Sequence, residues 1–203
     1  MSITVRTVGP SAVVTIDRPG RANALSVDLM GRLTAALGAA ASDHLGVVLT
    51  GAGGAFCGGA DLDDLRADPA RLQRALSNLR STLLALPVPT VAAIEGPCIG
   101  GGLEVAMACD ARIASRSAVF GIPAARLGVA YPEEGLALLR RRLPHQTLAR
   151  LFLLDERIGA DEAMAAGICA RVVDGSVVDA ALGVLGRVGD LDRATVAATK
   201  ARL

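Results

Sequence analysis

Short apolar runs alternate with breaks rich in glycine and proline along the chain, and most of these runs have the length of buried strands. Residues 3–8 and 12–16 are β-rich and are separated by residues 9–11 (GPS), which predicts a hairpin. Residues 46–50 and 90–94 are continuous apolar runs, which predicts strands buried on both faces. Further strands are predicted at residues 111–114, 119–120 and 168–173.

Apolar residues at helical spacing predict two long helices in the first half of the chain. Ser26 is placed to cap a helix that carries Leu29, Leu33 and Leu37 on one face. Pro69 opens the second helix, whose leucine stripe ends before the proline-rich residues 87–89. Shorter helices are predicted at residues 103–109, 135–143, 146–154, 161–166, 176–188 and 192–200.

Strand–turn–helix units recur roughly every 40 residues, which indicates an α/β fold with parallel strands. A chain of 203 residues can bury one sizeable core. We therefore expect a single domain over residues 1–203, with a helical C-terminal part.

The amino-acid composition indicates a globular protein and argues against a nucleic-acid-binding one. The chain is 52% hydrophobic and 20% charged, so it is globular. Lys and Arg number 21 against 20 Asp and Glu, and aromatic residues are scarce, which argues against nucleic-acid binding. The basic run at residues 140–142 is open to two interpretations, a solvated helix face or a phosphate contact.

The four cysteines and two histidines show no spacing typical of a zinc site, and a disulfide framework is not indicated either. No apolar run reaches the ~18 residues of a membrane span, and no charged-then-apolar leader opens the chain. These features predict a cytoplasmic protein that binds no nucleic acid and no membrane.

Candidate chemistry first appears at residues 100–104 (GGGLE), between the strand at 90–94 and a short apolar helix. The glycines leave backbone N–H groups free at a helix N-terminus, where an anion or a developing oxyanion is favoured. Glu104 lies in the first helical turn, so a carboxylate is held beside those donors. The pair suggests carbonyl chemistry. The alternative is that Glu104 only caps the helix.

A second glycine-rich loop lies at residues 51–62. It contains neither a G-x-G-x-x-G in register nor a Walker lysine, and the predicted helix at 69–86 begins too late for the loop to cradle a phosphate at its start. A dinucleotide site is therefore not predicted.

Five motifs in order resemble the crotonase, or enoyl-CoA hydratase/isomerase, superfamily. They are residues 18–25 (RPGRANAL), 55–62 (AFCGGADL), 100–104 (GGGLE), 120–123 (FGIP) with 127–128 (LG), and 161–168 (DEAMAAGI) followed by Val172 and Val173. The resemblance implies a spiral of ββα units over residues 1–173, with residues 174–203 as a shortened helical part. Family members usually continue past the position of Leu203 into helices that cover the active site.

The resemblance also implies an acyl-CoA thioester substrate and no separate cofactor, because coenzyme A is part of the substrate. The backbone N–H groups of Ala60 and Gly101 would hold the thioester oxygen, and Glu104 would transfer protons. Two fixed donors stabilise the negative charge that an enolate places on that oxygen.

Other substrate contacts are implied by position in the motifs. Asp61 and Leu62 would flank the pantetheine or adenine end, and Arg21 and Ala22 would lie near the nucleotide. For Arg21 the alternative is an exposed loop cation, and for Asp61 a turn or helix cap. The remaining candidates are Ala24, Gly58, Gly100, Pro123, Leu127 and Gly128.

The chain departs from the family pattern at the second catalytic carboxylate. Family hydratases carry a glutamate directly after the residue that corresponds to Pro123, and here that position is Ala124. Glu133 or Glu134 is a candidate replacement, although both can simply begin the helix that follows. Tyr131 can offer a hydroxyl or only pack.

Three functions follow from the resemblance. The first is hydration of a 2-enoyl-CoA, the second is double-bond isomerisation with one glutamate base, and the third is non-catalytic acyl-CoA binding. A homotrimer or a hexamer is the implied assembly.

Overall fold

The computed structural model describes all 203 residues, and its main element is a six-stranded sheet in the order β1-β2-β3-β4-β6-β9. The β1–β2 pair is antiparallel, and every later neighbouring pair in this sheet is parallel. The predicted hairpin and parallel sheet are therefore confirmed. The strands are β1 (Ser2–Val8), β2 (Ser11–Asp17), β3 (Gly46–Gly51), β4 (Thr90–Ile94), β6 (Ala111–Ser115) and β9 (Arg171–Val173).

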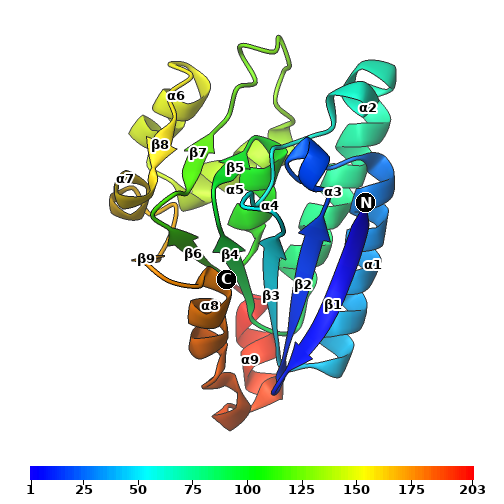
Figure 1. Ribbon diagram of the computed structural model, residues 1–203, viewed down its shortest axis with the longest axis vertical. Coiled ribbons are helices and arrows are strands. Elements are labelled where there is room, and N and C mark those ends of the chain that lie inside the picture. Colours follow the sequence, from blue (N-terminus) through cyan, green and yellow to red (C-terminus); the bar gives the residue numbers. More distant parts are fainter.

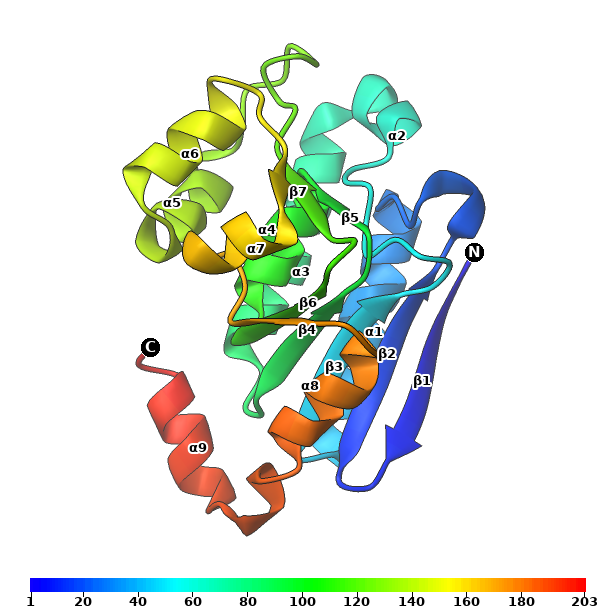
Figure 2. The same ribbon diagram turned by 60° about the vertical axis from the view of Figure 1, so that its left-hand side comes forward.

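Helices cover both faces of this sheet (Figures 1 and 2). On one face lie α1 (Val27–Asp43), which contacts β1, β2 and β3, and α3 (Pro69–Ala85), which packs on α1. Their leucine stripes are buried, as their spacing predicts. On the other face α8 (Val177–Leu185) contacts β2, β3, β4 and β6 and closes a smaller apolar cluster. Burial on both faces explains the continuous apolar runs of the central strands.

A second, three-stranded sheet extends from the end of β4, and the sequence did not predict it. Its strands β5 (Pro97–Ile99), β7 (Val119–Gly121) and β8 (Ile158–Gly159) lie in the order β5-β7-β8. β5 pairs with β7 in parallel, and β8 pairs with β7 in the antiparallel sense. Strands of two or three residues are too short to show an alternating pattern. Only β7 was predicted, and β5 was interpreted as part of a glycine turn.

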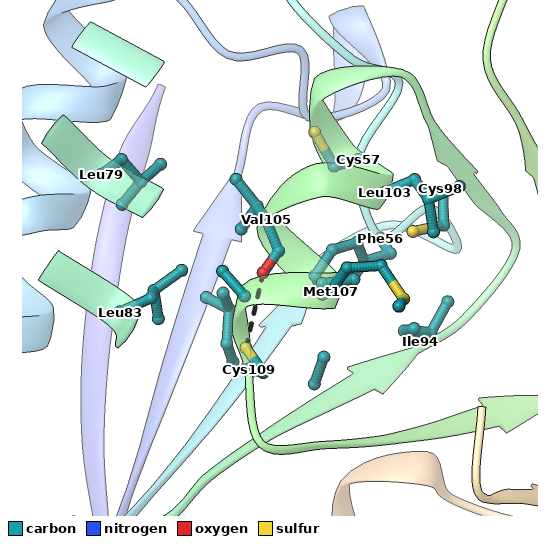
Figure 3. Packing of buried hydrophobic residues seen from close by; sticks show 14 of the residues in the cluster. Phe56, Cys57, Leu79, Leu83, Ile94, Cys98, Leu103, Val105, Met107 and Cys109 are labelled. Atoms are coloured by element: carbon teal, nitrogen blue, oxygen red, sulfur yellow. Dashed lines mark hydrogen bonds between the residues drawn. The ribbon is translucent and has the colours of Figure 1, made fainter. Parts of the chain in front are cut away.

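The helix α4 (Gly101–Ala108) is the centre of the larger core, and every one of its residues is buried. Figure 3 shows its side chains Leu103, Val105 and Met107 among Leu79 and other apolar residues from several elements. Apart from Glu104 the side chains of α4 are apolar on every face, and such a helix is stable only when it is enclosed by protein. The α3 and α5 helices and β5 provide that enclosure.

The remaining helices lie toward the ends of the sheet. They are α2 (Leu62–Ala67), α5 (Glu133–Arg142), α6 (His145–Phe152), α7 (Ala160–Ala165) and α9 (Arg193–Lys200), with short 3-10 turns η1 (Pro19–Arg21) and η2 (Val188–Asp190). No helix combines the length and apolar character that crossing a membrane requires. The predicted strand at residues 168–173 keeps only its last three residues, because the N–H groups of Ile168 and Cys169 still donate to Ala163 of α7 after the turn at Gly167. The oligomeric state and the domain limits stay predictions.

Candidate functional site

The loop that carries Ala60 is held on both sides by strand-like hydrogen bonds. On one side the N–H of Cys57 donates to Pro97, and the N–H of Ile99 donates to Cys57. On the other side, Leu25 forms a parallel bridge with Ala60. In this bridge the N–H of Leu25 donates to the carbonyl of Gly59, and the N–H of Asp61 donates to the carbonyl of Leu25. In such a bridge the central residue directs its own N–H away from its partner. The N–H of Ala60 accordingly donates to no acceptor in the protein.

Gly101 supplies a second free N–H close to the first. It is the first residue of α4, where a backbone N–H has no acceptor within the helix. The preceding Gly100 has φ of +53° and ψ of −118°, a conformation that favours glycine and turns the chain from β5 into α4. A methyl group added to Gly101 would lie only 3.6 Å from the Ala60 nitrogen. Two unpaired donors from separate turns therefore lie side by side.

Both donors border a cavity of about 410 Å³ between α2, α3, β5 and the segment that joins β7 to α5. This cavity lies at the end of the molecule where α2 and that segment stand out from the sheet (Figure 1). Its lining includes two arginines, Arg126 and Arg157, and no carboxylate. The other lining residues are Gly58, Gly59, Ala60, Leu62, Leu65, Leu72, Gln73, Leu76, Ile99, Gly100, Gly101, Ile122, Pro123, Ala124, Leu127, Val129, Tyr131 and Pro132. A mostly apolar cavity with free donors suits an acyl group whose carbonyl needs fixing.

Glu104 lies behind this lining and points into the protein, not toward solvent. Its side chain is fully buried, and its Oε1 accepts a 2.5 Å hydrogen bond from Nη1 of Arg80 on α3. Its Oε2 has no hydrogen-bond partner. A methyl group on Gly135 of α5 would come within 2.6 Å of Oε2, so only glycine leaves room for the carboxylate there. One carboxylate oxygen is thus paired with Arg80, and the other is buried without a hydrogen-bond partner.

Tyr131 joins Glu104 to the cavity. Its ring borders the cavity and packs edge-on against Phe152, with ring centroids 5.0 Å apart. Its hydroxyl is buried without a hydrogen-bond partner. Burial raises the pKa of this hydroxyl well above its usual value, and the negative charge of Glu104 raises it further. The hydroxyl is therefore neutral and able to donate.

The structure brings most of the predicted acyl-pocket residues together. Gly58, Leu62, Gly100, Pro123 and Leu127 all border the cavity with Ala60 and Gly101. Gly128 instead borders an adjoining groove that shares Leu62 and Leu127 with the cavity. These residues come from three separate segments of the chain, 58–62, 100–101 and 123–128.

Asp61 and Arg21 are not part of the cavity lining. Asp61 is 3% exposed, and its carboxylate caps α2 by accepting from the N–H groups of Asp63 and Asp64. Its other oxygen accepts a 2.6 Å hydrogen bond from Arg18. Arg21 is exposed and pairs with Asp63 at 3.1 Å. The structure favours the helix-cap and loop-cation alternatives for these two residues.

Ala22 and Ala24 do not line the cavity, and their backbone carbonyls instead bind residues that support the Ala60 loop. The carbonyl of Ala22 accepts from the N–H of Gly58, and the carbonyl of Ala24 accepts from Arg18. Their contacts fix the segment on which Ala60 lies. The glycine loop is followed directly by α2, contrary to the expected late helix start, and the Asp61 carboxylate occupies the α2 N-terminus where a phosphate would bind.

For Glu133 and Glu134 the structure favours the alternative that they simply begin a helix. Both are exposed residues in the first turn of α5, and Glu133 pairs with Arg140. Neither borders the cavity. Their position suits the helix dipole, which favours carboxylates at an N-terminus. Ala124 does border the cavity, so no second glutamate lies there.

Arg80 is the site residue that the sequence did not reveal. It lies directly after Leu79 in the leucine stripe of α3, where a charged residue is expected to face solvent, yet its side chain is 6% exposed. In the sequence, the one indication of its burial is its position beside the buried face of an amphipathic helix. Many solvated arginines occupy the same kind of position, so this indication is not specific.

Comparisons with known proteins identify the family. The model of the family described as enoyl-CoA hydratase/isomerase matches residues 9–203. This chain belongs to that family. A Mycobacterium leprae protein named probable enoyl-CoA hydratase echA12 is 37% identical, over 95% of this chain and 70% of the relative. A Clostridium acetobutylicum protein named short-chain-enoyl-CoA hydratase is 36% identical, over 83% of this chain and 67% of the relative.

Solved structures of the family share the fold. A Hyphomonas neptunium protein described as a putative enoyl-CoA hydratase/isomerase family protein superposes with a TM-score of 0.91 at 28% identity, covering 98% of this chain and 80% of its own. An enoyl-CoA hydratase/carnithine racemase from Magnetospirillum magneticum gives 0.90 at 32% identity, covering 98% and 78%. The crotonase-like fold predicted from the five motifs is confirmed.

Proposed function

We propose that this member of the enoyl-CoA hydratase/isomerase family binds an acyl-CoA thioester, stabilises its enolate and adds water to a 2-enoyl-CoA. The observation that carries the proposal is the pair of unpaired N–H groups, from Ala60 and Gly101, that meet at one cavity. The names of the relatives support the reaction, since two of them are called enoyl-CoA hydratases.

In this proposal the oxygen of water adds to the β-carbon of the conjugated thioester, and the double-bond electrons move onto the thioester oxygen. The two N–H groups hold that oxygen while it is negative. Glu104 takes the proton that water loses and returns it to the α-carbon, which restores the carbonyl. One carboxylate can perform both transfers because it is regenerated at the end.

The test is hydration of crotonyl-CoA and longer 2-enoyl-CoAs, followed by the loss of conjugated absorbance. We expect Glu104→Gln to lower kcat/KM by roughly 10²–10⁴, because a neutral amide cannot accept the proton. Glu134→Gln is the matched control, since Glu134 is exposed and lies outside the cavity. Unchanged turnover in Glu104→Gln would remove Glu104 from the mechanism.

Isomerisation of an enoyl-CoA double bond is a second candidate, and Ala124 favours it. Ala124 borders the cavity, and the buried Asp61 carboxylate is engaged as the α2 cap and by Arg18, which leaves Glu104 as the candidate base. A lone base suits a reaction that moves one proton between two carbons of the same substrate. We expect a 3-enoyl-CoA to give the 2-enoyl product if this reaction is the main one. Hydration without such a product would exclude it.

The same set of thioesters distinguishes an enzyme from a protein that only binds acyl-CoA, when melting temperature and turnover are both measured. Acyl-CoA that raises the melting temperature of the protein binds the native state, because a ligand of the folded form stabilises it by mass action. Such a rise together with turnover supports the enzyme. A rise with no turnover on the whole panel would replace the enzymatic proposal with that of a binding protein.

A further inference from the structure

The Arg80–Glu104 ion pair is buried where the rest of the core is apolar. The two side chains are 6% and 0% exposed, and the guanidinium Nη1 lies 2.5 Å from Oε1. The second guanidinium nitrogen, Nη2, donates to Ser77 at 2.8 Å, which fixes the arginine from the preceding turn of α3. The pair thus joins α3 to α4 within the larger core.

Burying two charges in this way brings little net stability. Removing both ions from water is costly, and a well-packed apolar pair of the same volume is often as stable or more so. Leucines surround the pair on α3, so an apolar alternative is available at this position. Stability therefore does not explain the ion pair, and we look for its role in the effect of Arg80 on the Glu104 carboxylate.

The groups around Glu104 leave Arg80 as its one cationic partner. From the segment before α5 it is faced by Tyr131, whose hydroxyl is neutral, and from α5 by the backbone of Gly135. The thiol of Cys57 lies beside the first turn of α4, and burial raises its pKa to about 12, so it carries no charge. Arg142 bonds to the opposite, C-terminal end of α4.

We propose that Arg80 is a positioning residue that fixes Oε1 of Glu104 in an ion pair, so that Oε2 is the one oxygen that exchanges protons. An opposite charge at this distance favours the ionised form of a carboxyl group. With Oε1 occupied, the proton is taken and returned on the same side of the substrate. The inference rests on the proposed role of Glu104 in catalysis.

The first test compares Arg80→Met with Arg80→Lys in the pH dependence of kcat/KM for a 2-enoyl-CoA. In Arg80→Met the buried carboxyl group loses its cation, so we expect the acidic limb of the profile to move up by roughly one pH unit or more, with about tenfold lower kcat at pH 7 and KM changed less than about twofold. Arg80→Lys keeps the charge and should keep the limb near its original position.

Arg142→Met is the matched control. Arg142 is a partly buried arginine at the end of α5, and its guanidinium donates to the carbonyl of Cys109 at 2.8 Å, at the opposite end of α4 from Glu104. We expect this variant to lose stability without moving the acidic limb. An Arg80→Met profile whose acidic limb matches that of wild type would overturn the inference and leave Arg80 a structural residue.

A second test needs no turnover and separates this inference from the proposed function. In Arg80→Met an unpaired Glu104 carboxylate is buried, so the folded state should bind a proton more readily than the unfolded chain, and the free energy of unfolding should rise as pH falls. The double variant Arg80→Met with Glu104→Gln should lack that rise. Equal pH dependence in both would refute the coupling, while inactivity of the wild type on every thioester would refute only the proposed function.

Discussion

At the residue scale, two adjacent glycines are required for different reasons. A methyl group on Gly102 would lie 2.6 Å from the Cys57 carbonyl oxygen, so glycine there lets α4 pack against the loop that carries Ala60. A methyl group on Gly101 would meet Leu76 at 3.4 Å and the Ala60 nitrogen at 3.6 Å. Gly101 therefore keeps space for a ligand atom beside the donors, and Gly102 permits the packing.

These contacts predict that substitution by alanine lowers activity at Gly101 and lowers stability at Gly102. Gly101→Ala should lower kcat/KM by about 10², because the added methyl stands between the two donors, with a stability change below about 1 kcal/mol. Gly102→Ala should lose about 1–3 kcal/mol of stability through overpacking. Enzyme kinetics and urea unfolding measure the two effects. Normal activity in a folded Gly101→Ala would contradict the placement of the oxyanion.

At the element scale, the six-residue helix α2 depends on one buried carboxylate. Asp61 caps the helix and pairs with Arg18, which links η1 and α2 across the base of the loop. Burial alone raises the pKa of Asp61, but the hydrogen bond from Arg18 and those from the N–H groups of Asp63 and Asp64 outweigh it, so the pKa is below its usual value.

A lowered pKa fixes the sign of the pH dependence. Asp61 contributes stability that is present above the usual aspartate pKa of about 3.9 and is lost as pH falls through its lower folded value. We expect Asp61→Asn to be less stable than wild type by about 1–3 kcal/mol at pH 7, a gap that narrows below about pH 4. Thermal unfolding at several pH values measures it. Asp28→Asn, on an exposed pair, should change little, and a gap for Asp61→Asn that widens toward acid would contradict the assignment.

At the scale of the whole molecule, the larger of the two apolar clusters encloses all four cysteines as free thiols. Figure 3 shows Cys57, Cys98 and Cys109 within the packing around α4. Burial raises the pKa of Cys57 and of Cys109 to about 12. The thiols are both inaccessible and protonated in the folded state.

Their reaction with a disulfide reagent therefore reports global unfolding. We expect fewer than one thiol to react in native buffer, at pH 7 and at pH 9 alike, since the thiolate is the reactive form. All four should react in denaturant. During a denaturant titration, the absorbance of the product that the reagent releases should follow the same unfolding transition as the circular dichroism signal. Rapid labelling of one thiol in the native state would indicate local opening around α4.

The sequence by itself determined the family, the order of the main elements and both donor positions. Periodicity is a local property, so the leucine stripes of α1 and α3 and the runs of β3 and β4 could be read directly. The order of the motifs identifies Ala60, Gly101 and Glu104 as candidate site residues although they lie up to about 40 residues apart in the sequence.

Only the tertiary structure decided what those residues meet. The three-residue β5 is stable because β7 and the Cys57 loop pair with it, and no local pattern encodes such partners. Whether Glu134 or Arg80 reaches the site depends on how α5 and α3 are rotated when they pack against α4, which is settled by long-range contacts. The burial of one charged residue and the exposure of the other follow from that packing and not from their neighbours in sequence.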